Sequence, residues 1–290
     1  MRIRSITIGA NVSYPPEESF FRACAEFQKR ARARFADNGL EVQTVRLATQ
    51  PFPEVLREAG PGEAVPLAQK MEKLCQAHSI DYCSIGTVVA APPVTDLASI
   101  DAIPAIIQRT ETVFASTLVS HREAGINLAA IARAAAAINT IAHSTPQGFG
   151  NLRFAVLANC EAGSPFFPAA FHRGPGPVFS IATEAADLAV DAFAQATTLE
   201  EAHENLKTSV EAMARTIVAV CHQLEEDHDF RFGGIDFSLA PYPETARSIA
   251  HAIEKLGVDV FGGHATLFAV AFITRILREA QFPRCGFYGL

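Results

Sequence analysis

The residues with most potential for chemistry lie in the segment LANCEAGSPFFPAAFHRGPG, Leu157 to Gly176. Asn159, Cys160 and Glu161 follow an apolar run, 152–158, which predicts a strand buried on both faces. Ligands bind beyond the carboxyl ends of strands in open parallel sheets and barrels, where loops and helix amino termini converge. We therefore expect Asn159, Cys160 and Glu161 to line a site. The alternative is that Asn159 and Glu161 cap the next helix.

A carboxylate and an imidazole that face one cavity can act as general base and acid, if burial brings their pKa values near neutrality. Glu161 and His172 are our candidates for this catalytic pair. The alternative is a capped loop with a solvated histidine. Cys160 is a candidate ligand-binding thiol, and only its position suggests a nucleophile.

A second candidate site is the turn Gly262-Gly263-His264, which we predict to lie between a strand, 258–261, and the last helix. Two glycines let backbone N–H groups face an anion at a helix amino terminus, so a carboxylate or phosphate would suit. The alternative is a tight turn with a hydrogen-bonded histidine.

Asp236 and Ser238 alternate with apolar residues in a predicted strand, 235–239, so their side chains point to the same side. One side of a barrel strand faces the lumen. A buried Asp236 needs a partner, and it either forms a structural salt bridge or lines the site.

Ser120 and Asn127 flank the start of an alanine-rich helix that we predict over 126–143. Capping of this helix is the main expectation, and ligand binding is the alternative.

No motif marks a metal or a nucleotide cofactor. His172, His264, Asp236 and Glu161 could meet in space, but no spacing such as HExxH marks them, so we predict no metal site. The chain has no Walker loop, and no GxGxxG follows a strand. The sequence therefore identifies no cofactor.

Predicted strands and helices alternate along nearly the whole chain, which indicates an α/β fold with parallel strands joined by right-handed crossovers. We expect one domain over residues 1–290, built as a parallel-rich α/β barrel. An open doubly wound sheet is the alternative, because periodicity does not choose between them.

The composition excludes several classes of partner. A formal net charge of −7 argues against a nucleic-acid surface, and no apolar stretch is long enough to span a bilayer. Six scattered cysteines are typical of reduced thiols, and no signal-peptide pattern opens the chain, so we expect a cytoplasmic protein. The apolar residues of 281–290 and a sheet edge left unpaired lead us to expect a homo-oligomer.

Several motifs resemble those of the DUF711 or UPF0210 family of bacteria and archaea. They are IRSITIGANV near the start, ETVFASTLVSHREAGINLAAIA, LANCEAGSPFFPAAFHRGPGP, and FGGIDFSLAPYPETARSIAHAIEKLG followed by FGGHAT. They stand in the family's order and cover nearly the whole chain. The patterns AN..E..PF..AFH and SLAP.P are the more specific ones.

The resemblance implies a fold similar to the ten-stranded α/β barrel of pyruvate formate-lyase and ribonucleotide reductase, in a family without an assigned activity. No glycyl-radical motif is present, so no radical chemistry follows. Two departures matter: TVVAAPP replaces a serine- and lysine-containing stretch, and family members continue past CGFYGL. On this comparison the chain lacks the family's carboxyl-terminal part.

Together these observations predict a site that binds a small polar or anionic metabolite, with acid/base chemistry at Glu161 or His172. The alternatives are a non-catalytic metabolite-sensing or assembly protein, and a divalent-metal-dependent hydrolase.

Overall fold

A computed structural model describes residues 1–90 and 97–287. Residues 91–96, in the predicted loop that holds TVVAAPP, and residues 288–290 of the apolar carboxyl end therefore lie outside the described residues. The strands are β1 (Arg2–Ala10), β2 (Val42–Thr49), β3 (Tyr82–Val89), β4 (Val113–His121), β5 (Gly125–Ile126), β6 (Phe154–Ala158), β7 (Val178–Glu184) and β8 (Arg231–Asp236). The helices are α1 (Glu18–Asp37), α2 (Phe52–Val55), α3 (Ala64–Ala77), α4 (Ala98–Arg109), α5 (Leu128–Ser144), α6 (Ala186–Ala194), α7 (Leu199–Asp227), α8 (Ile249–Lys255) and α9 (Thr266–Glu279), and short 3₁₀ helices are η1 (Pro61–Glu63), η2 (Pro146–Arg153) and η3 (Thr245–Arg247).

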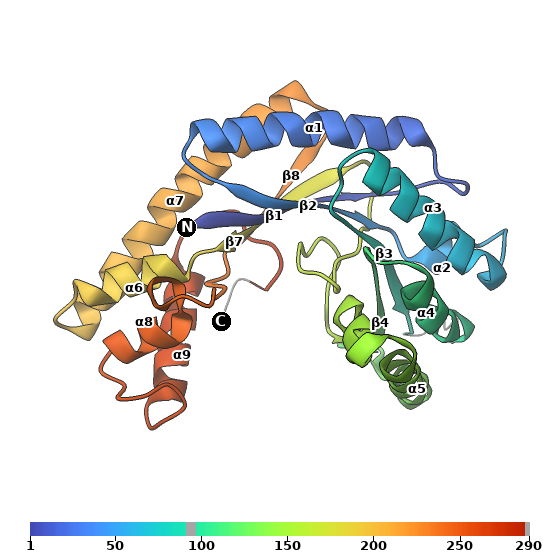
Figure 1. The fold of residues 1–290 in the computed structure, drawn as a ribbon. Coiled ribbons are helices and arrows are strands. Elements are labelled where there is room, and N and C mark those ends of the chain that lie inside the picture. The colour runs from blue at the N-terminus through green and yellow to red at the C-terminus, as the bar shows by residue number, and fades with distance from the viewer. Residues whose placement is uncertain (91–96, 288–290) are drawn as a thin grey trace. The chain divides into compact units, whose positions relative to one another are not determined.

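The eight strands form one sheet in the order β5-β4-β3-β2-β1-β7-β8, and β6 also pairs with β4 (Figure 1). β2 and β3, β3 and β4, and β4 and β6 are parallel neighbours, whereas the two-residue β5 is antiparallel to β4. This confirms the predicted α/β class with a mostly parallel sheet. Among the described residues no pairing joins the two ends of this strand order, so closure into a barrel stays a prediction.

Strand β7 runs in the opposite direction to β1. The amino-terminal ammonium of Met1 contacts the carboxylate of Asp187, just after β7, and Arg4 near the start of β1 lies 3.6 Å from Glu184 at the end of β7. The amino end of β1 therefore lies at the carboxyl end of β7. The rule that parallel strands end at one edge of a sheet does not extend to this pair.

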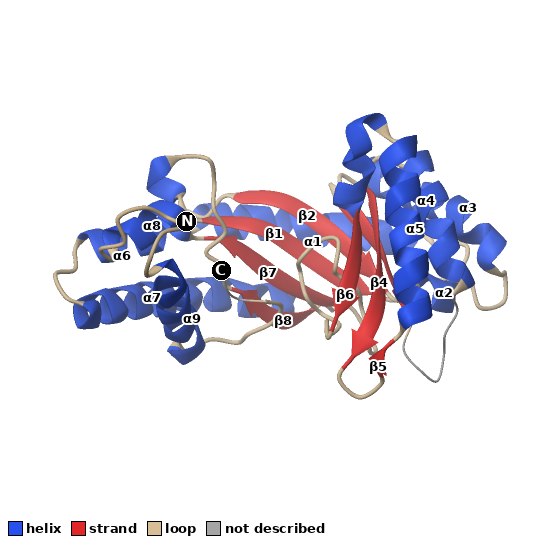
Figure 2. Cartoon of the chain, turned by 90° about the horizontal axis from the view of Figure 1, so that it is seen from below, coloured by secondary structure: helices blue, strands red, loops and turns tan. Residues whose placement is uncertain are grey.

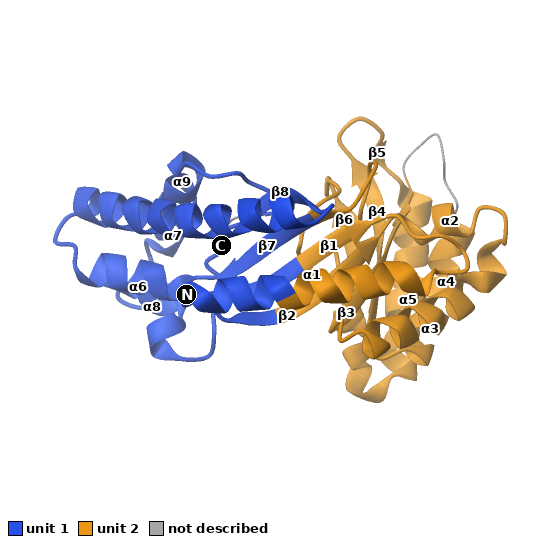
Figure 3. Ribbon diagram, turned by 90° about the horizontal axis from the view of Figure 1, so that it is seen from above, with its two compact units in different colours: residues 1–6, 30–43, 179–290 blue, residues 7–29, 44–178 orange. Residues whose placement is uncertain are grey.

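The chain divides into two compact units (Figure 3). Unit 1 comprises residues 1–6, 30–43 and 179–290, and unit 2 comprises residues 7–29 and 44–178. The chain changes unit within β1, α1 and β2. The expectation of a single domain stays a prediction, and each unit is described below by itself.

Unit 2 is built around β3 and β4, which are buried along most of their length. Helices α3 and α4 pack on these strands, and α5 packs on α4 and η2 (Figure 2). The apolar residues of α4 recur at helical spacing, with Ile100, Ile103 and Ile107 all buried. This periodicity buries one face of α4 against the sheet. Polar residues are left at the ends of the strands.

The predicted strand over 258–261 is wrong. Val260 and Phe261 are exposed there, and no described strand pairs with them. Nearby groups accept the backbone hydrogen bonds of this segment instead. The N–H of Phe261 donates to the Glu254 carboxylate, and the N–H of Gly263 donates to the carbonyl of Val260. This short apolar-rich run, framed by glycines, forms a turn because strand formation depends on cross-strand neighbours and no described strand pairs with it.

Candidate functional site

The two polar residues predicted around the start of α5 have structural contacts in unit 2. The Asn127 side chain accepts a hydrogen bond from the N–H of Ala130 at 3.0 Å and donates to the carbonyl of Ala90 at 2.9 Å. The capping expected for this segment is confirmed for Asn127. Ser120 contributes its carbonyl, which accepts the N–H of Asn159 at 2.9 Å and ties the end of β4 to the end of β6.

Asn159, Cys160 and Glu161 follow β6 as predicted, but the strand is not buried on both faces, because Val156 and Ala158 are exposed. The three residues after it also differ strongly in exposure. Asn159 has a left-handed backbone with φ of +51° and is exposed. Cys160 is buried, and burial, with a smaller effect of the Glu161 carboxylate, raises the pKa of its thiol. Glu161 is exposed, and its Oε1 lies 3.8 Å from Nε2 of His121. A buried thiol that resists ionisation is a poor nucleophile.

His172 is buried beside the carboxyl ends of β1 and β2. Its backbone N–H donates to the carbonyl of Thr49 at 2.9 Å, and its Nε2 lies 3.1 Å from the carbonyl of Gly174. A carbonyl oxygen can only accept, so Nε2 carries a proton in this contact. A Cβ atom at Gly9 would lie 3.0 Å from Nδ1 of His172, so a side chain there would press on the ring.

An open pocket of about 680 Å³ lies beyond the carboxyl ends of β1 and β2, within unit 2. We call it the β1–β2 pocket. The residues that line it come from the loop after β1, from the end of β2 and from α2 and the turn after it: Asn11, Tyr14, Gln50, Glu54, Val55, Arg57, Glu58 and Ala59. Sequence reasoning missed these residues, although Asn11 and Gln50 directly follow strands and could have been found by that position.

Hydrogen bonds hold the rim of the β1–β2 pocket in place. The Gln50 amide both accepts from the N–H of Val12 at 2.9 Å and donates to its carbonyl at 2.8 Å. Asn11 Nδ2 donates to the carbonyl of Gly174 at 3.0 Å, the same carbonyl that His172 contacts. His172 thus supports the loop that positions Asn11.

The charged residues of this pocket are unevenly paired. Glu54 lies 3.4 Å from the guanidinium of Arg173. The Tyr14 hydroxyl donates to Glu63 at 2.6 Å, and this hydrogen bond raises the pKa of Tyr14. Within residues 1–90 and 97–287 the guanidinium of Arg57 makes no ion pair or hydrogen bond, and neither does the Glu58 carboxylate. Among the described residues the pocket therefore offers one unpaired cation, Arg57, and one unpaired carboxylate, Glu58, to a ligand.

In unit 1, β8 ends at Asp236, so Ser238 lies beyond the strand and the predicted strand over 235–239 is wrong in its bounds. Asp236 is buried and hydrogen-bonded. Its Oδ1 accepts from the Ser238 hydroxyl at 2.5 Å, and its Oδ2 accepts the N–H of Phe287 at 3.0 Å. The Thr183 hydroxyl lies 3.0 Å from the carbonyl of Ser238, which joins the ends of β7 and β8. Asp236 and Ser238 hold this end of unit 1 together by hydrogen bonds.

Gly262, Gly263 and His264 lie in an exposed turn between α8 and α9. The N–H of Gly262 donates to the Thr266 hydroxyl at 3.0 Å, and the N–H of Gly263 donates to the carbonyl of Val260 at 2.9 Å. Both donors that were expected to face an anion are occupied in this structure. Anion binding at this turn stays a prediction that requires these bonds to open.

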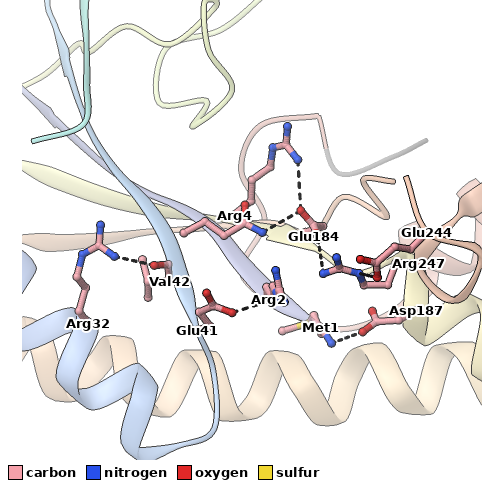
Figure 4. Close-up of polar contacts among 11 residues, drawn as sticks. Met1, Arg2, Arg4, Arg32, Glu41, Val42, Glu184, Asp187, Glu244 and Arg247 are labelled. Atoms are coloured by element: carbon pink, nitrogen blue, oxygen red, sulfur yellow. Dashed lines mark hydrogen bonds and ion pairs between the residues drawn. The ribbon is translucent and has the colours of Figure 1, made fainter. Parts of the chain in front are cut away.

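A buried carboxylate that the sequence did not reveal lies at the end of β7 in unit 1. Glu184 Oε2 accepts from the amide of Gln43 at 2.9 Å and lies 3.6 Å from Arg4, and Arg247 lies 3.4 Å from Oε1 (Figure 4). The guanidinium of Arg247 also lies over the ring of Tyr242, 3.8 Å from its centroid. Two guanidinium groups and an amide surround one carboxylate, an arrangement typical of a satisfied structural ion pair.

The predicted residues thus fall in both units: those between 120 and 172 in unit 2, and those between 236 and 264 in unit 1. The common site predicted for them stays a prediction. Within the described ranges no group of three or more His, Cys, Asp or Glu residues could hold a metal ion. No described helix is long and apolar enough to cross a membrane.

Comparison with known proteins places the chain among proteins of unassigned activity. The family described as "Uncharacterised ACR (DUF711)" matches residues 1–290. A UPF0210 protein of Neisseria meningitidis serogroup C (strain 053442) is 27% identical over 269 residues, covering 88% of this chain and 58% of the relative. A UPF0210 protein of Methanopyrus kandleri is 27% identical over 290 residues, covering 90% and 62%.

A third relative, a UPF0210 protein of Actinobacillus pleuropneumoniae serotype 5b, is 26% identical over 256 residues, covering 86% of this chain and 56% of the relative. The chain therefore spans less than two thirds of the length of these curated relatives.

Proposed function

The chain belongs to the DUF711 family of uncharacterised proteins, and on that premise we propose that its β1–β2 pocket binds a small polar metabolite with a carboxylate or phosphate group. One observation carries this proposal: the pocket lies beyond the carboxyl ends of parallel-sheet strands and contains Arg57, a guanidinium without a partner in the described chain. Guanidinium groups bind carboxylates and phosphates through paired hydrogen bonds.

The rest of the pocket favours a ligand that also donates hydrogen bonds. Glu58 is an acceptor without a partner among the described residues, and Asn11 keeps its side-chain oxygen for a ligand because its Nδ2 bonds Gly174. A hydroxyl or ammonium group on the metabolite would complement them. The rim is held by Gln50 and His172 before any ligand arrives, which lowers the entropic cost of binding.

We also propose acid/base chemistry on this metabolite, with Glu161 and His172 as the candidate groups. The position of His172 behind the rim supports it. Its Nε2–H is committed to Gly174, so a proton transfer from His172 would first require this contact to break. A non-catalytic metabolite sensor uses the same pocket without this step.

We also propose that the mostly parallel sheet belongs to a ten-stranded barrel, as the family resemblance implies, and that the protein acts in the cytoplasm. The alternation of strands and helices supports the first, and the unpaired, reduced character of the cysteines supports the second.

Binding is tested by thermal shift and calorimetry against a panel of small carboxylates and phosphates, with wild type, Arg57→Gln and Arg22→Gln. Arg22 is the matched control, because it is exposed on α1, lies outside the pocket and makes no ion pair with the described chain. Losing a charge-assisted hydrogen bond costs about 1.5–3 kcal/mol, so Arg57→Gln should weaken binding by roughly 10- to 150-fold. Arg22→Gln should bind as wild type does.

The proposal fails if no member of the panel binds, or if Arg57→Gln binds as tightly as Arg22→Gln. Mass spectrometry of the bound metabolite after incubation then separates the enzyme from the sensor. A changed mass supports turnover, and an unchanged ligand supports sensing.

A further inference from the structure

The charged groups of the β1–β2 pocket restrict the kind of ligand that it can hold. Beside the guanidinium of Arg57 the pocket is lined by two carboxylates, Glu54 and Glu58. Its directly bonded neighbours add one charge of each sign. They are Arg173, which pairs with Glu54, and Glu63, which accepts a hydrogen bond from the tyrosine of the pocket. Three carboxylates therefore outnumber two guanidinium groups, and this set of residues is negative as a whole.

Two of these five charges have no partner among the described residues. Glu54 lies 3.4 Å from its guanidinium partner, and each neutralises the other. Glu63 accepts the Tyr14 hydroxyl at 2.6 Å, and this bond raises the pKa of Tyr14, so the tyrosine stays uncharged at neutral pH. Arg57 and Glu58 form no ion pair with each other or with any other described residue.

An unpaired guanidinium beside an unpaired carboxylate favours a ligand that carries both signs of charge. A phosphate dianion would pair with Arg57, but it would also lie in a site with an excess of carboxylates, and like charges repel. An amine without a carboxylate would pair with Glu58 and be repelled by Arg57. A neutral sugar would displace water from both groups without forming an ion pair with either. A zwitterion forms both ion pairs.

The two walls of the pocket are held in place by hydrogen bonds of the chain itself. Leu56 is buried, and its carbonyl accepts the N–H of Gly60 at 2.8 Å, which closes the turn 57–59 at both ends. The hydrogen bond from Tyr14 to Glu63 ties the loop after β1 to η1, which follows this turn. A site that is ordered in advance loses less entropy when a ligand binds.

The other lining residues match the remaining parts of such a ligand. Asn11, from the loop after β1, donates its Nδ2 to the carbonyl of Gly174 at 3.0 Å, which leaves its Oδ1 as an acceptor. An ammonium group has three hydrogens to donate, so it can bond Asn11 and Glu58 together. Val55 and Ala59 are the apolar residues of the lining, and they suit the carbon skeleton of the ligand.

We propose that the ligand of the β1–β2 pocket is an amino acid in its zwitterionic form, with its carboxylate bound to Arg57 and its ammonium group bound to Glu58 and Asn11. This inference rests on the proposed function, because it concerns the same pocket, and it narrows the class of metabolite to those that carry an ammonium group. It involves neither Glu161 nor His172, so it applies to an enzyme and to a sensor alike.

Calorimetry on the purified chain tests the inference with ligands that differ by one group. The twenty standard amino acids are titrated first. The tightest of them is then compared with its 2-hydroxy analogue, in which a hydroxyl replaces the ammonium group, with its methyl ester, which has no carboxylate, and with inorganic phosphate. Because hydrogen bonds between charged groups are the stronger kind, we expect the amino acid to bind at least about 10-fold more tightly than each of the three.

Substitutions in the protein separate the two ends of the ligand. Glu58→Gln should weaken binding of the amino acid by roughly 10- to 150-fold and leave binding of the 2-hydroxy acid within about 3-fold, whereas Arg57→Gln should weaken binding of both. Glu26→Gln is the matched control, because Glu26 is exposed on α1, lies outside the pocket and makes no ion pair with the described chain. All three positions are exposed, so the variants should unfold at the wild-type temperature, which circular dichroism verifies.

The outcomes distinguish this inference from the proposed function. If amino acids, carboxylates and phosphates all fail to bind, both are overturned. If the 2-hydroxy acid or phosphate binds as tightly as the amino acid, the inference is overturned and the proposed function stands. The same holds if Glu58→Gln changes the affinity for the amino acid no more than Glu26→Gln does.

Discussion

Replacement of Gly86 by alanine should disturb both the stability of unit 2 and the β1–β2 pocket. Gly86 lies in β3 with φ of +80°, where the pairing of β3 with β4 shifts register between Ser84 and Thr87. A Cβ atom built there lies 2.4 Å from the carbonyl oxygen of Gln50 and 2.8 Å from Cα of Pro51. Both are backbone atoms, so the clash is relieved only if the end of β2 moves.

The expected size follows from two separate costs. A left-handed backbone at a residue with a Cβ costs about 1–2 kcal/mol. Forcing extra atoms into a packed site typically costs about 1–3 kcal/mol more. Gly125 is the matched control, because its φ of +75° carries the first cost and no atom lies within 4 Å of its would-be Cβ. Gly125→Ala should therefore lose about 1–2 kcal/mol, and Gly86→Ala about 2–5 kcal/mol.

Thermal unfolding followed by circular dichroism measures the difference. For a protein of this size 1 kcal/mol shifts Tm by about 2–4 °C, so Gly86→Ala should lower Tm by roughly 4–20 °C and Gly125→Ala by roughly 2–8 °C. Gly86→Ala should also weaken the binding of any ligand in the β1–β2 pocket, because Gln50, which the new side chain would displace, lines that pocket. Equal shifts for the two variants would refute the contact with Gln50 as the reason for glycine at position 86.

Two further perturbations test the buried groups. Glu184→Gln should lower the free energy of unfolding by about 2–4 kcal/mol, because it removes a buried charge that Arg4 and Arg247 approach, whereas the exposed Glu26→Gln should stay within about 0.5 kcal/mol in urea unfolding. Equal midpoints for the two variants would contradict a structural role for Glu184. Burial raises the pKa of the Cys24 thiol to about 12, above its ordinary value of 9.0. Between pH 9 and 12 the unfolded chain loses this proton and the folded protein keeps it, so stability falls as pH rises, by at most about 1.4 kcal/mol per pH unit for this thiol. Cys24→Ala should show a shallower loss of stability from pH 9 to 10.5 than wild type, and parallel slopes would count against burial as the cause.

The local elements could be predicted because their signals are local. The start of β7 at Val178, the helix α5 within a residue or two, and the N-cap at Asn127 follow from hydrophobic periodicity and capping chemistry. The error over 258–261 has the same origin, since a short apolar run looks like a strand whether or not a neighbouring strand exists to pair with it.

The candidate site was only partly predictable. His172 was identified from its glycine- and proline-rich surroundings, and it does lie at the ends of β1 and β2. Asn11, Gln50 and Arg57 were not identified, because no single one of them has a distinctive neighbourhood in the sequence. They form a pocket only when the ends of two strands and the turn after α2 meet.

The sequence by itself determined an α/β fold with mostly parallel strands, because the spacing of apolar residues dictates which segments become strands and which become helices. Only the tertiary structure decided the direction of β7 against β1 and the burial of Glu184 between Arg4 and Arg247. Arg4 and Glu184 are separated by nearly two thirds of the chain, and a contact at that distance leaves no periodic trace in either segment. Its existence depends on where the whole sheet places the two strand ends.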